Sequence, residues 1–237
     1  MNYSSHVRMG RQRLLVGAVL TASLIATSCA SASPPHVKVP PKSTPRKVLI
    51  VGDSLLFKDQ YKIYQEIERD GEWDVVNIEA RLGATTYRHQ TIDNALANTD
   101  VDALILSFGY NEISDIRGNI ARPVPRSAVE ASWQTVVDVA KTNCLGWMTL
   151  QDAGWKKIGA KDTSTLMQMV QWMNNLIRTQ GGKVLPVEWG PMIDINIIEN
   201  WPNGSNLWVD SDGFHPKEGT WAKNAMGIKM REMLEQC

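Results

Sequence analysis

The stretch Lys47–Leu55, with the sequence KVLIVGDSL, decides the fold of this chain. Its apolar and partly β-branched run is typical of a buried strand, and Gly, Asp and Ser follow at the end of that strand. Open α/β sheets bind their ligands at the carboxyl ends of their strands. Ser54 is therefore a candidate nucleophile, although Asp53 and Ser54 are also ordinary residues for capping the start of a helix.

Downstream of this stretch, short apolar runs alternate with longer segments of helical character. This alternation predicts an α/β fold in which helices cover both faces of a parallel sheet. The expected strands are 47–52, 73–80, 103–108, 144–150 and 183–189. The expected helices are 59–69, 85–97, 127–141, 163–180 and 217 to about 234. A chain of 237 residues can bury a sizeable core, and we expect one domain over residues 46–237.

The first 32 residues have the features of an export signal. Three Arg precede an apolar run from Leu14 to Ala26, and small residues follow at 30–32. Cys29 lies in a segment similar to a bacterial lipobox, but Ala26 stands where that motif usually has Leu. The sequence leaves open whether Cys29 carries a lipid that attaches the protein to a membrane or is only a small residue near the cleavage point. Either way we expect an exported protein.

Residues 33–45 contain five Pro and are typical of an extended linker. The whole chain has a formal charge of zero, and without its first 32 residues it carries 22 basic and 25 acidic side chains. Such a balance is not typical of a protein that binds nucleic acid. Cys144 and Cys237 remain after export, and in an oxidising compartment they could form a disulfide or stay as separate thiols.

A serine nucleophile needs a general base, and His215 is the best candidate. His6 and His36 lie in the expected signal and linker, and His89 lies in an expected helix. Asp212, three residues before His215, could accept a hydrogen bond from the imidazole and orient it. Asp212 could alternatively cap the helix that follows, or could bind a metal together with Asp210 and His215.

Two other strand ends could supply hydrogen-bond donors to an oxyanion. Gly83 follows the second expected strand and, without a Cβ, can bring its backbone N–H close to a ligand. Asn111 follows the third expected strand after Gly109 and can direct its side-chain amide toward the same sheet edge. Gly and Asn are also common in ordinary turns between a strand and a helix.

Together, Gly52-Asp53-Ser54-Leu55, Gly83, Gly109-x-Asn111 and Asp212-x-x-His215 resemble the four sequence blocks of the SGNH, or GDSL-type, esterases and lipases. The resemblance extends over most of the expected domain and implies a flavodoxin-like three-layer α/β/α fold. It implies that Ser54 is the nucleophile, His215 the general base and Asp212 its orienting partner. Ser54, Gly83 and Asn111 would form the oxyanion hole, and no metal or organic cofactor is implied.

One position departs from the family pattern. The third block often continues with Asn-Asp, whereas Glu112 follows Asn111 here, so that the acidic character of the position is kept. The implied substrate is a small acyl ester, either of an acetylated carbohydrate or of a lipid. Replacement of water by another alcohol would make the same site an O-acyltransferase.

A non-catalytic carbohydrate-binding domain is the alternative from a different class, but binding alone does not require a Ser and a His in separate segments. A phosphate-binding loop is disfavoured, because the turn at Gly52 lacks both a Gly-x-Gly-x-x-Gly pattern and the Lys of a P-loop.

Four Trp residues and one long segment could surround the site. Trp155, Trp189, Trp201 and Trp208 follow the last two expected strands and could line a crevice or belong to the core. Residues 111–126 are expected to form a long loop that could cover the crevice or simply connect two elements.

Overall fold

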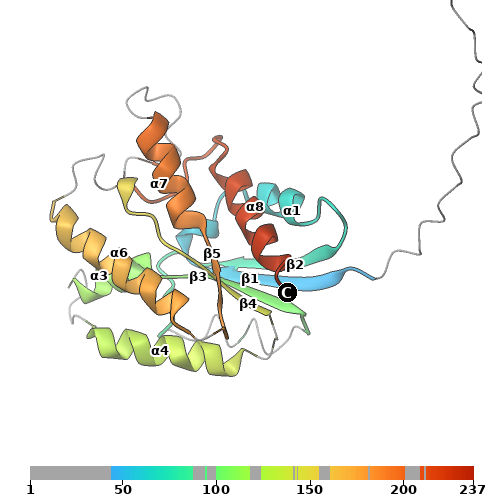
Figure 1. The fold of residues 1–237 in the computed structure, drawn as a ribbon, viewed down its shortest axis with the longest axis horizontal. Helices are drawn as coiled ribbons and strands as arrows, with labels where there is room; N and C mark the ends of the chain where they lie inside the picture. The colour runs from blue at the N-terminus through green and yellow to red at the C-terminus, as the bar shows by residue number, and fades with distance from the viewer. Residues whose placement is uncertain are drawn as a thin grey trace, which may run out of the picture. The chain divides into compact units, whose positions relative to one another are not determined.

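In the computed structural model of this protein, a five-stranded parallel sheet lies between two layers of helices (Figure 1). The structure describes residues 44–87, 94, 100–117, 124–140, 142, 144–154, 161–180, 182–200, 209, 210 and 212–237, without the side chains of 195–200. The expected signal, Cys29 and most of the expected linker lie outside these residues.

The strands are β1 (Arg46–Gly52), β2 (Trp73–Ala80), β3 (Ala103–Ser107), β4 (Cys144–Met148) and β5 (Leu185–Val187). Their order across the sheet is β2-β1-β3-β4-β5, which is the flavodoxin-like order. The predicted three-layer fold with a parallel sheet of about five strands is therefore confirmed. All five strands end at the same edge of the sheet, so the segments that follow them meet there.

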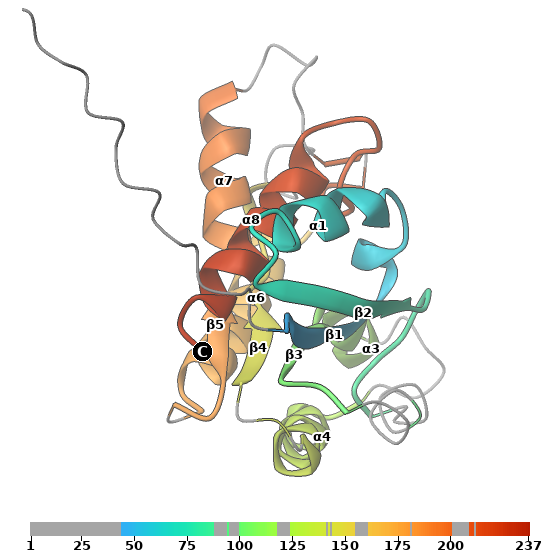
Figure 2. The ribbon, with the colours of Figure 1, turned by 90° about the vertical axis from the view of Figure 1, so that its right-hand side faces the viewer.

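The helices divide between the two faces of the sheet. On one side α1 (Gln60–Ile67) packs beside α8 (Ala222–Leu234), as both views show (Figures 1 and 2), together with α7 (Trp189–Asn200). On the other side lie α3 (Tyr110–Ile116), α4 (Arg126–Val139) and α6 (Thr163–Arg178). A short 3₁₀ turn, η1 (Ser54–Leu56), follows β1 directly.

Alternation of apolar side chains along β1 explains why both faces are covered. Val48 and Ile50 enter the core beneath α1 and α8, whereas Leu49 and Val51 enter the core beneath α4 and α6. Because successive residues of a strand point to opposite faces, a continuous apolar run requires helices on both sides. β1 therefore lies between two layers of helices, and its last five residues are buried.

The structure corrects several sequence-based expectations. Part of the expected loop 111–126 is helix α3, whose residues Tyr110 and Ile113 are buried, and α4 already begins at Arg126. Trp189 does not line a crevice, because its side chain is fully buried in the core beneath α7. Trp155, Trp201 and Trp208 lie outside the described residues.

The ends of some elements also differ from expectation. The last helix begins at Ala222 and not at Lys217, because Pro216 forms an isolated β-bridge with Val209 and Gly219 has a positive φ of 75°. Helix α7 was not expected at all. Thr85–Tyr87, the described start of the expected helix 85–97, is a turn, and nearly all of the remaining positions lie outside the described residues.

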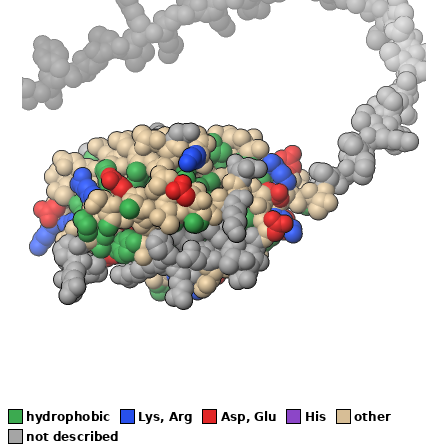
Figure 3. Space-filling model, turned by 90° about the horizontal axis from the view of Figure 1, so that it is seen from below, with side chains coloured by type: hydrophobic (Ala, Val, Ile, Leu, Met, Phe, Trp, Pro, Cys, Tyr) green, Lys and Arg blue, Asp and Glu red, His purple; other side chains and the backbone are tan. Residues whose placement is uncertain are grey.

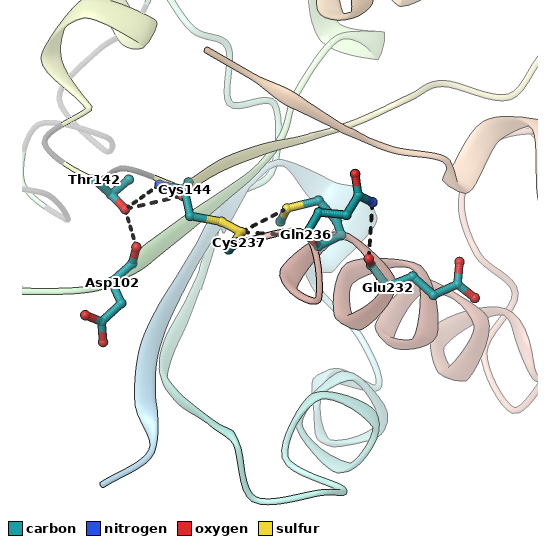
Figure 4. The surroundings of a disulfide bond; sticks show 7 residues. Asp102, Thr142, Cys144, Glu232, Gln236 and Cys237 are labelled. Carbon is teal, nitrogen blue, oxygen red and sulfur yellow. Dashed lines mark hydrogen bonds between the residues drawn. A yellow bond between two sulfur atoms is a disulfide. The ribbon is translucent and has the colours of Figure 1, made fainter. Parts of the chain in front are cut away.

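A disulfide joins Cys144, the first residue of β4, to Cys237, the last residue of the chain (Figure 4). The two Cα atoms are 5.6 Å apart, and 93 positions separate the two residues in sequence. Thr142 supports this end of β4, since its hydroxyl accepts a hydrogen bond from the Cys144 amide at 3.1 Å. The bridge thus fastens the C-terminal segment after α8 to the amino end of the sheet.

Surface charge is mixed. On the face seen in Figure 3, acidic and basic side chains are scattered over the described part, and neither sign dominates. Among the described residues, no helix combines the length and the apolar character that crossing a bilayer requires.

Candidate active site

Ser54 lies at the first position of the turn that follows β1. Asp53 caps this turn, because its Oδ1 accepts a hydrogen bond from the Leu55 amide at 3.0 Å. The capping interpretation of Asp53 is thus correct, and it leaves the Ser54 side chain partly exposed at the carboxyl edge of the sheet. Ser54 is the first residue of η1, and the first amides of a helical turn have no partner within that turn.

Ser54, His215 and Asp212 form a hydrogen-bonded triad. Nε2 of His215 is 2.6 Å from Ser54 Oγ, and its Nδ1 is 2.5 Å from Asp212 Oδ2. A carboxylate can only accept, so Nδ1 donates to Asp212, and the unprotonated Nε2 is left to accept the Ser54 hydroxyl. This arrangement can remove a proton from the serine as its oxygen attacks an electrophile.

The Asp212 carboxylate is held ionised and in place by the loop that follows it. Its Oδ1 accepts hydrogen bonds from the amides of Phe214 and His215, both at 3.0 Å. Partial burial acts to raise the pKa of Asp212, but the hydrogen bonds from the His215 side chain and from these amides outweigh it and lower the pKa. Both oxygens are therefore committed to this loop, and within the described residues no group of three or more ligands is arranged to hold a metal.

The two other predicted donor segments meet beside Ser54. The Asn111 amide donates from Nδ2 to the Ala84 carbonyl at 3.0 Å and to Asp53 Oδ2 at 3.3 Å. Gly83 directly precedes Ala84 and has a φ of +67°, a conformation that side chains with a Cβ rarely adopt. The structure thus brings the segments of Ser54, Gly83 and Asn111 to one place.

Two buried carboxyl groups support this junction. Asp53 is fully buried, and loss of solvation raises its pKa to about 7 despite the hydrogen bond from the Leu55 amide. Glu112 is also fully buried, and desolvation raises its pKa to about 6 although its Oε1 accepts the Thr86 amide at 2.8 Å. Glu112, at the position that departs from the family pattern, thus fastens the loop after β2 to α3.

A buried lysine contacts the residue that follows the candidate nucleophile. Lys223 is 2% exposed, and its Nζ donates to the Leu55 carbonyl. Burial lowers its pKa to about 7, against the opposing influence of Asp59 and Asp53. The first turn of α8 is thereby fixed to η1.

The loop that carries His215 rests on the turn after β4. Gln151 is fully buried, and its Nε2 donates to the Gly213 carbonyl at 2.5 Å while its Oε1 accepts the Gly154 amide at 3.0 Å. A Cβ on Gly154 would lie 1.9 Å from the Gly213 carbonyl oxygen, so only glycine allows the two turns to pack this closely. The turn after β4 therefore helps to position the loop that carries Asp212 and His215.

Tyr110 connects the Asn111 side of the site to the same support. Its hydroxyl donates to the Gln151 carbonyl and accepts from the Gln151 amide, both at 2.8 Å. Its ring stacks on Phe214 with centroids 5.2 Å apart, and Phe214 packs against the His215 ring at 4.3 Å. The loop that carries His215 and helix α3, which carries Asn111, are therefore supported by contacts with the same two residues, Tyr110 and Gln151.

Sequence reasoning did not single out these supporting residues. Gln151 follows the end of an expected strand, so its position at the site edge could have been noticed. Tyr110 and Lys223 gave no comparable signal, because a Tyr before Asn111 and a Lys in an amphipathic helix are ordinary surface residues in most proteins.

Comparison with solved structures identifies the same fold in several esterases and in an O-acetyltransferase domain. A GDSL-like lipase from Parabacteroides merdae aligns with a TM-score of 0.60 at 11% identity, covering 82% of this chain and 98% of the other. An acetyl xylan esterase from Geobacillus stearothermophilus aligns with a TM-score of 0.55 at 15% identity, covering 82% and 94%. The catalytic domain of a Streptococcus pneumoniae peptidoglycan O-acetyltransferase aligns with a TM-score of 0.52 at 12% identity, covering 82% and 93%.

No family model matches the sequence, and no curated protein matches it. At these levels of identity the structural matches establish the fold and leave the chemistry to the residues themselves. The chain has the three-layer fold of the GDSL-type hydrolases.

Proposed function

We propose that this protein is an exported serine ester hydrolase of the SGNH or GDSL type. The observation that carries the proposal is the triad formed by Ser54 Oγ, His215 and Asp212, with contacts of 2.6 and 2.5 Å at the carboxyl edge of the sheet. Two of the structural neighbours, by their names, are a GDSL-like lipase and an acetyl xylan esterase, which supports an acyl ester as the substrate.

In the proposed reaction, Ser54 Oγ attacks the ester carbonyl carbon while His215 Nε2 takes the serine proton. The imidazolium is stabilised by Asp212, and the oxyanion accepts hydrogen bonds from the amides of Ser54 and Gly83 and from the Asn111 side chain. Collapse of the tetrahedral intermediate breaks the bond to the alcohol, which leaves with the proton from His215. Water then loses a proton to His215 and attacks the acyl-serine. Collapse of the second tetrahedral intermediate breaks the bond to Ser54 Oγ, which takes the proton back from His215, and the acid is released.

To donate to the oxyanion, the side-chain amide of Asn111 has to give up one of its two present hydrogen bonds. Its Nδ2 contacts Asp53 at 3.3 Å, longer than its contact with Ala84, so this weaker hydrogen bond is the one that an oxyanion would replace. The remaining contact with Ala84 would keep the side chain directed toward Gly83.

Hydrolysis of 4-nitrophenyl acetate by the purified protein tests the proposal. Ser54→Ala should reduce kcat by about 10⁶-fold, because the hydroxyl that forms the acyl-enzyme is lost and only substrate binding and the oxyanion hole still contribute. Ser127→Ala, which changes an exposed serine of α4, serves as the matched control and should retain full activity. Equal activity of Ser54→Ala and the wild type would refute the assignment.

An O-acyltransferase is the second candidate, and the specific observation that favours it is the fold shared with a peptidoglycan O-acetyltransferase domain. A transferase would release nitrophenol faster when a sugar acceptor is added, and acetylated sugar would accumulate in place of acetate. A hydrolase would release nitrophenol and acetate in equal amounts whether or not the acceptor is present.

Export is part of the proposal and rests on residues 1–32. The N-terminus of the protein recovered from its host distinguishes the two forms. A lipid-modified Cys29 at the N-terminus indicates a membrane-attached lipoprotein, whereas an unmodified terminus near residue 33 indicates a secreted protein. Recovery of the full chain with Met1 in the cytoplasm would contradict export.

A further inference from the structure

Three aromatic side chains of the described residues are more than half exposed. They are Phe57 at 51%, Tyr61 at 57% and Trp221 at 52%. Large aromatic side chains are the principal contributors of buried area in cores and at binding surfaces, so leaving three of them in water is costly. Their exposure calls for a binding partner if they lie on a common surface.

Polar contacts hold their two segments together. The segment 55–62, which contains Phe57 and Tyr61, lies beside the segment 217–223, which contains Trp221, and Figures 1 and 2 both show α1 beside α8. The contacts are Lys58 Nζ–Glu218 Oε2 at 2.8 Å, Lys62 Nζ–Thr220 O at 2.9 Å, Gly219 N–Asp59 Oδ2 at 3.2 Å and Lys223 Nζ–Leu55 O. We call this pair of segments the aromatic surface.

Both segments of the aromatic surface adjoin segments of the candidate active site. Phe57 closes the turn that Ser54 begins, and its amide donates to the Ser54 carbonyl at 3.1 Å. Trp221 is the residue directly before α8, which follows the loop of His215. A ligand bound across the aromatic surface would therefore lie next to the segments that carry the nucleophile and its base.

The chemistry of the surface favours a carbohydrate over a hydrocarbon chain. Lys58 and Glu218 lie within the two paired segments and are 63% and 61% exposed. An acyl chain or a bilayer placed here would remove water from this ion pair without replacing its hydrogen bonds, which is unfavourable. A sugar ring presents a C–H face that can stack on aromatic rings and hydroxyl groups that can bond to Lys58 and Glu218.

We propose that Phe57, Tyr61 and Trp221 bind the polysaccharide chain from which the acyl group is removed. This proposal rests on the proposed ester hydrolysis and specifies its substrate as an acylated polymer. The aromatic surface would hold sugar units next to the one whose ester enters the site. Binding there would raise kcat/KM for a polymer more than for a small ester, because a small ester does not reach the aromatic surface.

The test compares two substrates, O-acetylated xylan and 4-nitrophenyl acetate. We expect Trp221→Ala to lower the ratio of the two kcat/KM values, polymer over small ester, by roughly tenfold, which corresponds to loss of one aromatic contact. Tyr61→Ala and Phe57→Ala should lower it in the same direction. Val139→Ala removes an exposed apolar side chain at the far end of α4 and should leave the ratio unchanged.

A binding measurement covers the case in which acetylated xylan is not cleaved. Ser54→Ala protein is incubated with insoluble xylan and, separately, with insoluble peptidoglycan, and the bound fraction is measured with and without Trp221→Ala. Retention by either polymer that falls at least threefold with Trp221→Ala supports the proposal. No retention by either polymer, or retention that is independent of all three aromatic residues, overturns it.

The two proposals fail in different ways. If nitrophenyl acetate hydrolysis does not depend on Ser54, the proposed ester hydrolysis is wrong. Hydrolysis can instead depend on Ser54 while substitution of Phe57, Tyr61 and Trp221 changes neither the ratio of kcat/KM values nor the bound fraction. In that case only the role of the aromatic surface is wrong.

Discussion

The side-chain amide of Asn111 reaches the carboxylate of Asp53, with Nδ2 3.3 Å from Oδ2, and so connects the start of α3 to the end of β1. The same nitrogen bonds the Ala84 carbonyl in the loop after β2. One side chain thus joins the segments that follow three neighbouring strands. In the proposed reaction it also donates to the oxyanion.

Asn111→Ala should therefore lower kcat for 4-nitrophenyl acetate by about 10²–10³-fold, with little change in KM, because the lost hydrogen bond forms fully only in the transition state. Asn175→Ala changes an exposed asparagine of α6 and is the matched control. An Asn111→Ala enzyme that retains its kcat would exclude the side chain from the oxyanion hole.

The hydrogen bond from His215 Nδ1 to Asp212 Oδ2 leads to the second prediction. Asp212→Asn can present a donor to Nδ1 and favour the tautomer whose Nε2 carries the proton, which cannot accept from Ser54. We expect kcat to fall by about 10³–10⁴-fold while the folded structure remains intact. Steady-state kinetics together with circular dichroism checks both parts, and a fall of less than tenfold would contradict the role of Asp212.

Local pattern was sufficient to predict the sheet, whereas the candidate nucleophile, base and donor positions were combined into one site by their resemblance to the four SGNH sequence blocks. An apolar run such as residues 48–51 specifies a doubly covered strand, and polar residues at strand ends meet at one edge. Helix α3 was not predicted because its residues look polar and irregular until the burial of Tyr110 and Ile113 is known.

The support of the His215 loop could not be predicted for a related reason. Gln151 and Gly213 are far apart in sequence, and their contact exists only because β4 ends beside that loop. Likewise, Lys223 is an ordinary helix residue in the sequence, and only the packing of α8 on α1 buries it behind Leu55. Such contacts depend on long-range packing, and they cannot be predicted from the local sequence pattern.

Gln151 gives the third prediction. Gln151→Leu keeps approximate volume but removes the donor to the Gly213 carbonyl and the acceptor for the Gly154 amide. The His215 loop should then shift relative to Ser54, and kcat should fall by roughly 10–10²-fold while KM changes little.

Two readouts separate positioning from loss of folding. Gln65→Leu, at an exposed position of α1, is the control for the substitution itself. The dependence of kcat on pH should shift in Gln151→Leu, because a displaced loop changes the contact between His215 Nε2 and Ser54 Oγ. An unaltered pH profile combined with a uniform loss of folded protein would indicate a structural role only.

The disulfide leads to a prediction about stability. Cys144 and Cys237 lie at the amino edge of the sheet, opposite to the candidate site, and their bridge closes a loop that spans 93 positions. Replacing both with Ala should lower the free energy of unfolding by about 2–5 kcal/mol, because the unfolded chain gains freedom. Activity at low temperature should persist.

Urea unfolding with and without a reductant measures this effect. The reductant should destabilise the wild type and leave the double Ala variant unchanged. Equal unfolding midpoints for the oxidised wild type and the double variant would show that the bridge contributes nothing to stability.

The buried carboxyl of Glu112 predicts how stability changes with pH. Desolvation raises its pKa from an ordinary 4.5 to about 6 in the folded protein. Between these values the folded state binds more protons than the unfolded state, so the free energy of unfolding falls as the pH rises through this window. The full loss is present above about pH 6 and absent below about pH 4.5, and it amounts to about 2 kcal/mol.

Glu112→Gln removes this titration, while its side-chain oxygen can still accept a hydrogen bond from the Thr86 amide. We therefore expect the stability of the variant relative to the wild type to rise by about 2 kcal/mol between pH 4 and pH 7.5. Removing the Glu112 charge also lowers the pKa of Asp53, which changes the difference in the same direction. Urea unfolding at both pH values measures it, with the exposed Glu235→Gln as control. A stability difference that is the same at both pH values would mean that Glu112 does not titrate as a buried carboxyl, and that the loop after β2 is held to α3 by other contacts.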